Sequence, residues 1–269
     1  MKKELIKKDY YRAVNGSWLE KAEIPSDQPQ MSAFLELHLE IEKLLMELAE
    51  SWNKNQTALD KNLIKFVKLY RMSKDFETRE KLGVEPIKPI LKKIKKLTSL
   101  KDLVKNIKEF HLEGIEMPFG FSVVQDFMNS NNHVLYFSEA SLFLPDKSHY
   151  ENEQTKQQLL GAFMMTSNQV LKLYGLTDEE AGDILNKAVA FDGLLANVSK
   201  TNVEKADYVK MYNPVKNEDV RKQVKNFNLM DQVEGLVKQE VDQLIVMNLD
   251  FLNAFDSIIN ETNFKLIKS

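Results

Sequence analysis

The spacing of apolar residues along the chain predicts a protein built mainly from amphipathic helices. The clearest pattern begins after Ser32, a residue type suited to the N-cap of a helix. The apolar positions that follow it are Phe34, Leu37, Ile41, Leu44, Leu45 and Leu48. Because they recur every three or four residues, they form one stripe along a helix.

Similar spacing predicts further helices in both halves of the chain. We expect them over residues 59–73, 76–82, 90–97, 103–110, 151–174, 177–199, 216–226, 229–239 and 248–260. Gly83 and Gly114 are expected to end two of these helices. Thr177 and Glu180 have the spacing of a capping box, which is expected at the start of the helix over 177–199. Residues 9–30 are expected to be irregular, because Asn15-Gly16 is typical of a turn and prolines follow at 25 and 29. Trp18 and Leu19 are expected to attach this arm to the body.

One part of the chain has a different pattern. Residues 119–126 and 134–138 are rich in aromatic and β-branched side chains, and residues 129–132 between them have the composition of a turn. They predict one small β-hairpin-like pair at about 119–138, which needs helices to pack on. The predicted fold class is therefore mainly α, a multi-helix lobe with one small hairpin.

Composition excludes several classes of protein. The chain has 269 residues, and its 37 Lys and Arg against 40 Asp and Glu give a net charge of −3, which argues against a generally basic nucleic-acid-binding protein. Cysteine is absent, so disulfide scaffolds, thiolate metal sites and cysteine nucleophiles are excluded. No apolar run is long enough to cross a bilayer and the start lacks a secretory signal, so we expect a cytoplasmic protein without a membrane partner.

The residues by themselves indicate no catalytic site. The histidines, His38, His111, His133 and His149, are not spaced to bind one metal ion from a helix. Nucleophile motifs and phosphate-binding glycine loops are absent. The lysine-rich stretch Lys88–Lys108 is expected to be a solvated helix face. Asp192, which lies among apolar positions, is expected to make a polar contact at the surface.

Several strings of residues follow one another in a distinctive order. They are Asp9-Tyr10-Tyr11-Arg12-Ala13-Val14-Asn15-Gly16-Ser17-Trp18-Leu19, Ile24-Pro25, Val123-Val124-Gln125-Asp126, Leu144-Pro145-Asp146, Phe191-Asp192-Gly193-Leu194-Leu195-Ala196 and Tyr212-Asn213-Pro214. In this order they resemble the neprilysin-like zinc endopeptidases, of the bacterial oligopeptidase O type, over essentially the whole chain. His149 departs from the pattern, since the family has Tyr there.

The resemblance implies that this chain is the helical covering lobe of such an enzyme. It implies an N-terminal arm over residues 1–30 and a covering lobe over 31–269, followed in the parent by a catalytic lobe that carries the zinc site. No catalytic or metal-binding residues and no cofactor are then expected in this chain, which should be inactive alone. The implied partners are oligopeptide substrates and the C-terminal catalytic lobe of the same polypeptide.

The resemblance also places two candidate substrate-facing residues. In some family members two arginines bind the terminal carboxylate of the substrate, and alignment on Ile24-Pro25 and Phe34 puts Gln30 and His38 at their positions. A neutral amide cannot replace the bidentate, charged fork of arginine, and histidine carries charge only when protonated. We therefore expect weak anchoring of the carboxylate and cleavage at internal bonds.

Two other functions remain open on the sequence. The chain could be a helical scaffold that binds a partner protein through an exposed apolar face. Less favoured is a nucleic-acid-binding module that uses the Lys88–Lys108 stretch, whose binding would weaken steeply with salt.

Overall fold

The structure is a computed structural model that describes residues 2–57 and 59–269. It divides into two compact units, residues 1–83 and 84–269. The division predicted between residues 30 and 31 remains a prediction, and that position lies inside the first unit. Among the described residues, every helix is too short or too polar to span a lipid bilayer.

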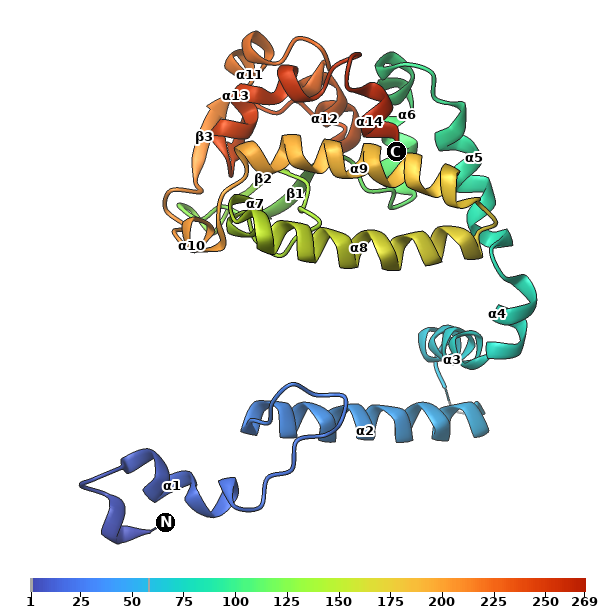
Figure 1. The fold of residues 1–269 in the computed structure, drawn as a ribbon. Helices are drawn as coiled ribbons and strands as arrows, with labels where there is room; N and C mark the ends of the chain where they lie inside the picture. Colours follow the sequence, from blue (N-terminus) through green and yellow to red (C-terminus); the bar gives the residue numbers. More distant parts are fainter. Residues whose placement is uncertain (1, 58) are drawn as a thin grey trace. The chain divides into compact units, whose positions relative to one another are not determined.

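The first unit consists of helices, and a long connection over residues 20–32 separates the second of its elements from the third (Figure 1). Its elements are η1 (Lys3–Leu5), α1 (Tyr10–Leu19), α2 (Ala33–Lys54), α3 (Lys61–Lys74) and α4 (Phe76–Leu82). Helix α2 begins as predicted, with Ser32 Oγ accepting a hydrogen bond from the Leu35 N–H at 3.1 Å. Gly83, with φ of +51°, ends α4 as predicted, because glycine adopts this conformation without a Cβ clash.

The prediction that residues 9–30 are irregular is wrong for α1. Asp9 caps this helix by accepting a hydrogen bond from the Arg12 N–H at 2.9 Å. The Asn15-Gly16 pair lies within the helix, where Ala13 and Gly16 are buried and the Ala13 carbonyl accepts a hydrogen bond from the Lys2 N–H at 2.8 Å. The prolines come only after the helix has ended. Trp18 attaches α1 to α2 as expected, by donating a hydrogen bond to Glu36 at 3.0 Å.

The second unit begins with helices and contains the sheet. Its elements are η2 (Glu85–Ile87), α5 (Lys88–Lys96), α6 (Leu100–Leu112), β1 (Phe119–Gln125), β2 (His133–Glu139), α7 (Ser148–Glu151), α8 (Glu153–Leu173), α9 (Asp178–Val198), α10 (Asn202–Lys205), β3 (Asn213–Lys216), α11 (Asn217–Gln223), α12 (Leu229–Val237), β4 (Gln243–Val246), α13 (Leu249–Ile258) and α14 (Phe264–Lys268). The predicted capping box is present at the start of α9, between Thr177 and Glu180. Helices α8 and α9 lie side by side (Figure 1).

The β-structure is larger than the predicted hairpin. The hairpin is present as β1 and β2, which pair antiparallel with Phe121 opposite Phe137. Two further strands extend it into a sheet of order β1-β2-β4-β3, in which β2 and β4 are parallel. Sequence analysis missed β3 and β4 because each has only four residues, too few to show a periodic pattern. Helix α11 consequently starts after Lys216, which belongs to β3.

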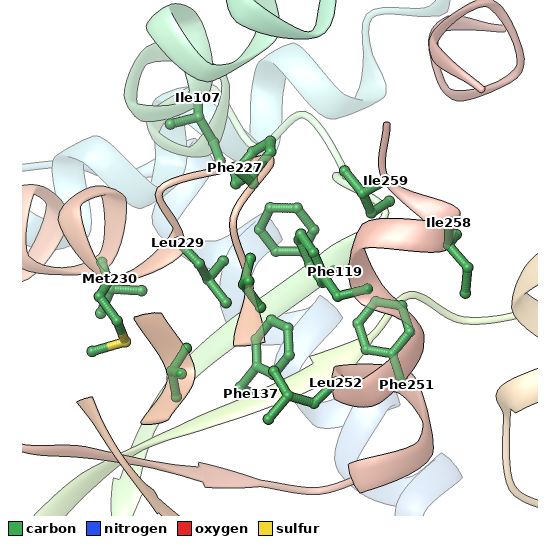
Figure 2. Close-up of a cluster of buried hydrophobic side chains, with 14 of the residues drawn as sticks. Ile107, Phe119, Phe137, Phe227, Leu229, Met230, Phe251, Leu252, Ile258 and Ile259 are labelled. Carbon is green, nitrogen blue, oxygen red and sulfur yellow. The ribbon is translucent and has the colours of Figure 1, made fainter. Parts of the chain in front are cut away.

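The core of the second unit joins the hairpin to helices much later in the chain. Figure 2 shows Phe119 and Phe137, from neighbouring strands, beside Phe227 and Phe251. The ring centroids of Phe119 and Phe227 are 5.0 Å apart, and those of Phe137 and Phe251 are 5.7 Å apart. Phe255 contacts rings from both strands. These rings bury a large apolar area and hold the sheet against α13.

We predict that Phe137→Ala destabilises the second unit by about 3–5 kcal/mol, because it opens a cavity at a side chain with no exposed surface. The matched control is Leu173→Ala on α8, whose side chain is 80% exposed and whose loss should change stability by less than about 0.5 kcal/mol. Urea unfolding followed by circular dichroism measures both. Equal midpoints for the two variants would contradict the central position of Phe137.

Candidate functional site

The two predicted substrate-facing residues lie in the first unit and do not contact each other. Gln30 is exposed in the connection between α1 and α2. His38 lies on α2, where its side chain is exposed and its Nε2 is 3.1 Å from the Glu42 carboxylate. The role of these residues as substrate contacts remains a prediction.

The resemblance strings in the second unit meet one another in pairs. The first pair joins the loop before α7 to α9. The Asp192 carboxylate accepts hydrogen bonds from the Phe143 N–H, at 2.9 Å, and from the Tyr150 hydroxyl, which in turn accepts from the Leu144 N–H at 3.0 Å. Asp192 is 2% exposed, so the prediction of a surface contact is wrong. Burial raises the pKa of Asp192 above its ordinary value and also raises the pKa of Tyr150.

The same loop is fixed at a second point by Asp146. Its carboxylate accepts hydrogen bonds from the hydroxyl and N–H of Ser148 and from the N–H of Asn202, at the start of α10. These bonds to the charged form, first of all from the Ser148 hydroxyl, lower the pKa of Asp146 to about 2. Asn202 also donates through its side chain to the Pro145 carbonyl at 3.2 Å. The Leu144-Pro145-Asp146 string is therefore a tightly bound loop.

The third contact joins the hairpin to the segment before β3. The Tyr212 hydroxyl donates to the Asp126 carboxylate at 2.8 Å, and this contact raises the pKa of Tyr212. Asn213 donates through its side chain to the Val246 carbonyl on β4 at 2.9 Å. The strings that carry the resemblance thus act as structural contacts that set the positions of strands and loops.

A small polar hollow lies where β2 and β4 end. It has a volume of about 190 Å³, and its lining includes Glu139, Lys200, Lys205 and Asn248. Asn248 is buried and donates to Glu139 at 3.1 Å and to the Val198 carbonyl at 2.9 Å. Its side-chain oxygen also caps α13. Charged groups of both signs meet here, which suits binding of a polar group and includes no nucleophile–base pair.

The residues that sequence analysis missed here are Asn248 and its partners. The signal available in the sequence is Asn248 itself, an N-cap residue type directly before an apolar helical pattern. Its contacts with Glu139 and Val198 join segments far apart in the chain, which no local pattern reveals.

The donor set of this chain does not suit a zinc ion. Across residues 2–57 and 59–269, no three His, Cys, Asp or Glu side chains gather as a metal ion requires.

Comparison with known proteins identifies the family. The sequence profile of peptidase family M13, in its N-terminal part, matches residues 6–269. The chain belongs to peptidase family M13. The predicted resemblance to neprilysin-like zinc endopeptidases is thereby confirmed.

The M13 relatives include bacterial endopeptidases. The chain is 36% identical over 267 residues to a neutral endopeptidase of Lactococcus lactis subsp. lactis, covering 98% of this chain and 42% of that protein. It is 31% identical over 261 residues to a putative zinc metalloproteinase of Streptococcus gordonii, covering 96% of this chain and 46% of that protein. The chain therefore spans somewhat under half the length of these relatives.

Solved structures share the M13 fold. A crystal structure of PEPO from Lactobacillus rhamnosis superposes with a TM-score of 0.83 at 21% identity, covering 98% of this chain and 42% of that one. The zinc metalloprotease ZMP1 of Mycobacterium tuberculosis, crystallised with an inhibitor, gives a TM-score of 0.84 at 24% identity, covering 98% and 40%. The predicted mainly helical fold class is confirmed.

We predict that the contribution of Asp146 to stability depends on pH. Because its pKa is lowered from 3.8 to about 2 in the folded chain, the stabilisation is complete above about pH 4 and is lost as pH falls toward 2. The difference in unfolding free energy between wild type and Asp146→Asn should therefore shrink over that range. Urea unfolding at a series of pH values measures it.

The matched control for this prediction is Asn202→Ala. It removes the side-chain bond to the Pro145 carbonyl and keeps the backbone N–H that Asp146 accepts from. Asn202→Ala should therefore keep the wild-type pH dependence. If Asp146→Asn also kept the wild-type pH dependence of the unfolding free energy, Asp146 would not be its source and the prediction would be wrong.

Proposed function

We propose that this chain is the covering, substrate-enclosing lobe of a zinc-dependent endopeptidase that hydrolyses oligopeptides. The observation that carries the proposal is the match to family M13 over residues 6–269, combined with a length of only 42% of a neutral endopeptidase relative. The catalytic portion of the same polypeptide would hold the zinc and supply the chemistry. This lobe restricts access by size and contributes walls.

The apolar stripe of α2 supports a further portion of the same polypeptide as partner. Phe34 is 88% exposed, and Leu37, Leu44 and Leu45 are each more than half exposed. A contiguous apolar face of this kind is unusual on a free monomer and is typical of a surface that another protein segment covers. In the alternative function, a binding scaffold, a separate protein would cover the same face.

The lysine-rich stretch gives little support to a nucleic-acid-binding function. Lys93 is paired with Glu109 and Glu113, and Lys88 with Glu85. Lys95 lies over the Tyr174 ring at 5.6 Å. Partly neutralised lysines make a weak phosphate-binding surface, so we propose no nucleic-acid partner.

Activity of the full-length protein tests the proposal. It should cleave a short quenched fluorescent peptide, lose activity with a chelator and regain it with zinc, since a metal-bound water is the expected nucleophile in the parent. The 269-residue chain alone should release no fluorescence, because the metal ligands would lie outside it. Cleavage by this chain alone, or failure of the full-length protein to respond to zinc, would overturn the proposal.

Size restriction is tested with one substrate sequence, presented either as a free peptide or as a loop of a folded protein. The full-length enzyme should cut the free peptide and leave it intact when it forms a loop of a folded protein, because an enclosed chamber excludes folded domains. Equal cleavage of both would argue against an enclosing lobe. The proposal also includes a cytoplasmic location, which fractionation of the native cells would test.

We predict that the full-length enzyme shows little preference for a free substrate carboxylate, because Gln30 and His38 replace the arginine pair of other members. Peptides with a free or an amidated C-terminus should be cleaved with similar kcat/KM. The double variant Gln30→Arg with His38→Arg should raise the preference for the free acid by about tenfold or more, the effect of added charge-assisted hydrogen bonds. A large preference in the wild type would contradict the assigned positions.

A further inference from the structure

The two edges of the sheet differ in how they resist pairing with another strand. β3, at one edge, has four residues and includes Pro214 and Lys216, which are residue types that block strand addition. β1, at the other edge, has seven residues, Phe-Gly-Phe-Ser-Val-Val-Gln, without proline or charge. Only the β1 edge is therefore chemically open to an added strand.

The hydrogen bonds that flank the hairpin show which backbone groups of β1 face outward. The Ala140 N–H donates to the Pro118 carbonyl at 3.2 Å, and the Asp126 N–H donates to the Asn132 carbonyl at 2.9 Å. In an antiparallel pair such bonded positions alternate with unbonded ones. The even-numbered residues of β1 therefore bond to β2, and the N–H and C=O of Phe121, Val123 and Gln125 point to the open edge.

This edge is accessible over its second half. The side chain of Val123 is 60% exposed and that of Val124 47% exposed. Beyond the strand, Phe127 and Met128 are 61% and 72% exposed, and Phe127 lies 6.4 Å from the Tyr212 ring. Unpaired backbone groups beside exposed apolar side chains are the features by which a sheet edge takes up an extended peptide.

A hollow borders the first half of the same strand. It has a volume of about 340 Å³, and its lining includes Phe119, Gly120 and Phe121 of β1. Glu116, Glu139 and His111 also line it, whereas no lysine or arginine does, so its two carboxylates outnumber its one basic group. The hollow therefore favours a positively charged side chain near Phe121.

We propose that the open edge of β1 binds an extended peptide segment as a fifth strand, with a basic side chain of the peptide in the hollow lined by Glu116 and Glu139. The inference rests on the proposed function, because that function makes unfolded peptides the ligands of this lobe. The inference adds a site on this lobe that binds the peptide backbone and that is separate from the proposed catalytic portion.

The periodicity of backbone hydrogen bonds provides the decisive test. The probe is a seven-residue peptide of alternating threonine and valine with one lysine near one end, blocked at both termini and labelled for fluorescence anisotropy with the 269-residue chain. Two N-methylated versions are compared, one methylated at the odd-numbered peptide residues and one at the even-numbered residues. One version should bind about tenfold or more weakly and the other should bind almost like the unmethylated peptide, because only alternate amides of an edge strand bond to its neighbour. Equal weakening of binding in the two N-methylated peptides, or no saturable binding of the unmethylated peptide, would overturn the proposal.

Hydrogen exchange of the chain supplies an independent readout. On adding the peptide, the amides of Phe121, Val123 and Gln125 should gain protection, whereas those of Ser122 and Val124, already bonded to β2, should change little. Protection of other surfaces alone would mean that the peptide binds elsewhere and would overturn the assignment to β1.

A pair of variants at Val123 tests the edge from the protein side. Val123→Pro removes an outward N–H, a position at which an edge strand tolerates proline, and should weaken peptide binding by about tenfold while the circular dichroism spectrum is retained. The matched control Val123→Thr keeps the backbone groups and should bind like the wild type. Equal binding by both variants would refute the role of this edge.

Glu116→Gln tests the hollow. It should reduce the preference for the lysine peptide over the same peptide with glutamate, because one of the two carboxylates is removed. An unchanged preference would refute the proposed charge recognition.

The experiments can show that this inference is wrong while the proposed function holds, and the reverse. Peptide binding is measured on the chain without catalysis, whereas the proposed function is measured as zinc-dependent cleavage by the full-length protein. If the full-length protein cleaves peptides and its β1 amides are already protected without peptide, the catalytic portion covers this edge and the inference is wrong.

Discussion

The packing of phenylalanine rings between the β1–β2 hairpin and α13 is the interaction on which the second unit depends. A two-stranded ribbon is only marginally stable in water, and here its inner face contributes Phe119 and Phe137 to a core completed by Phe251 and Phe255. These contacts join segments far apart in the sequence. The hairpin, the inserted strand β4 and α13 therefore share one core.

The polar contacts described for this unit follow from that core. Once the hairpin and α9 are held in place, the buried Asp192 can bind the loop before α7, and Asp146 can bind the same loop to α10. Asp192 accepts two hydrogen bonds within this unit and Asp146 accepts three. Both carboxylates therefore stabilise the loop before α7.

The two units present different surfaces for this role. The first unit exposes an apolar helical stripe along α2, suited to being covered by a further portion of the polypeptide. The second unit has a buried aromatic core and, in β1, a strand at the edge of its sheet. In the functions that we propose, covering and peptide binding would thus use separate elements of one chain.

Local sequence patterns were sufficient to predict most of the longer helices and the hairpin. The stripe after Ser32, the capping box at Thr177 and the helix-ending Gly83 were all predicted from residues close together in the chain, because helix periodicity and capping are local properties. Helix α1 was wrongly predicted as irregular because Asn15-Gly16 is typical of a turn, whereas in the structure this pair lies inside a helix capped by Asp9. The family was recognised from ordered strings whose structural purpose the sequence did not reveal.

Tertiary structure decided the rest. The strands β3 and β4 exist because they complete a sheet started by residues far away, and a four-residue strand has no pattern of its own. Burial of Asp192 and the contacts of Asn248 likewise depend on which segments the fold brings together. The sequence alone thus determined most of the longer helices and the family, whereas the sheet edges, the hollows and the contacts of the buried carboxylates arise only from long-range packing.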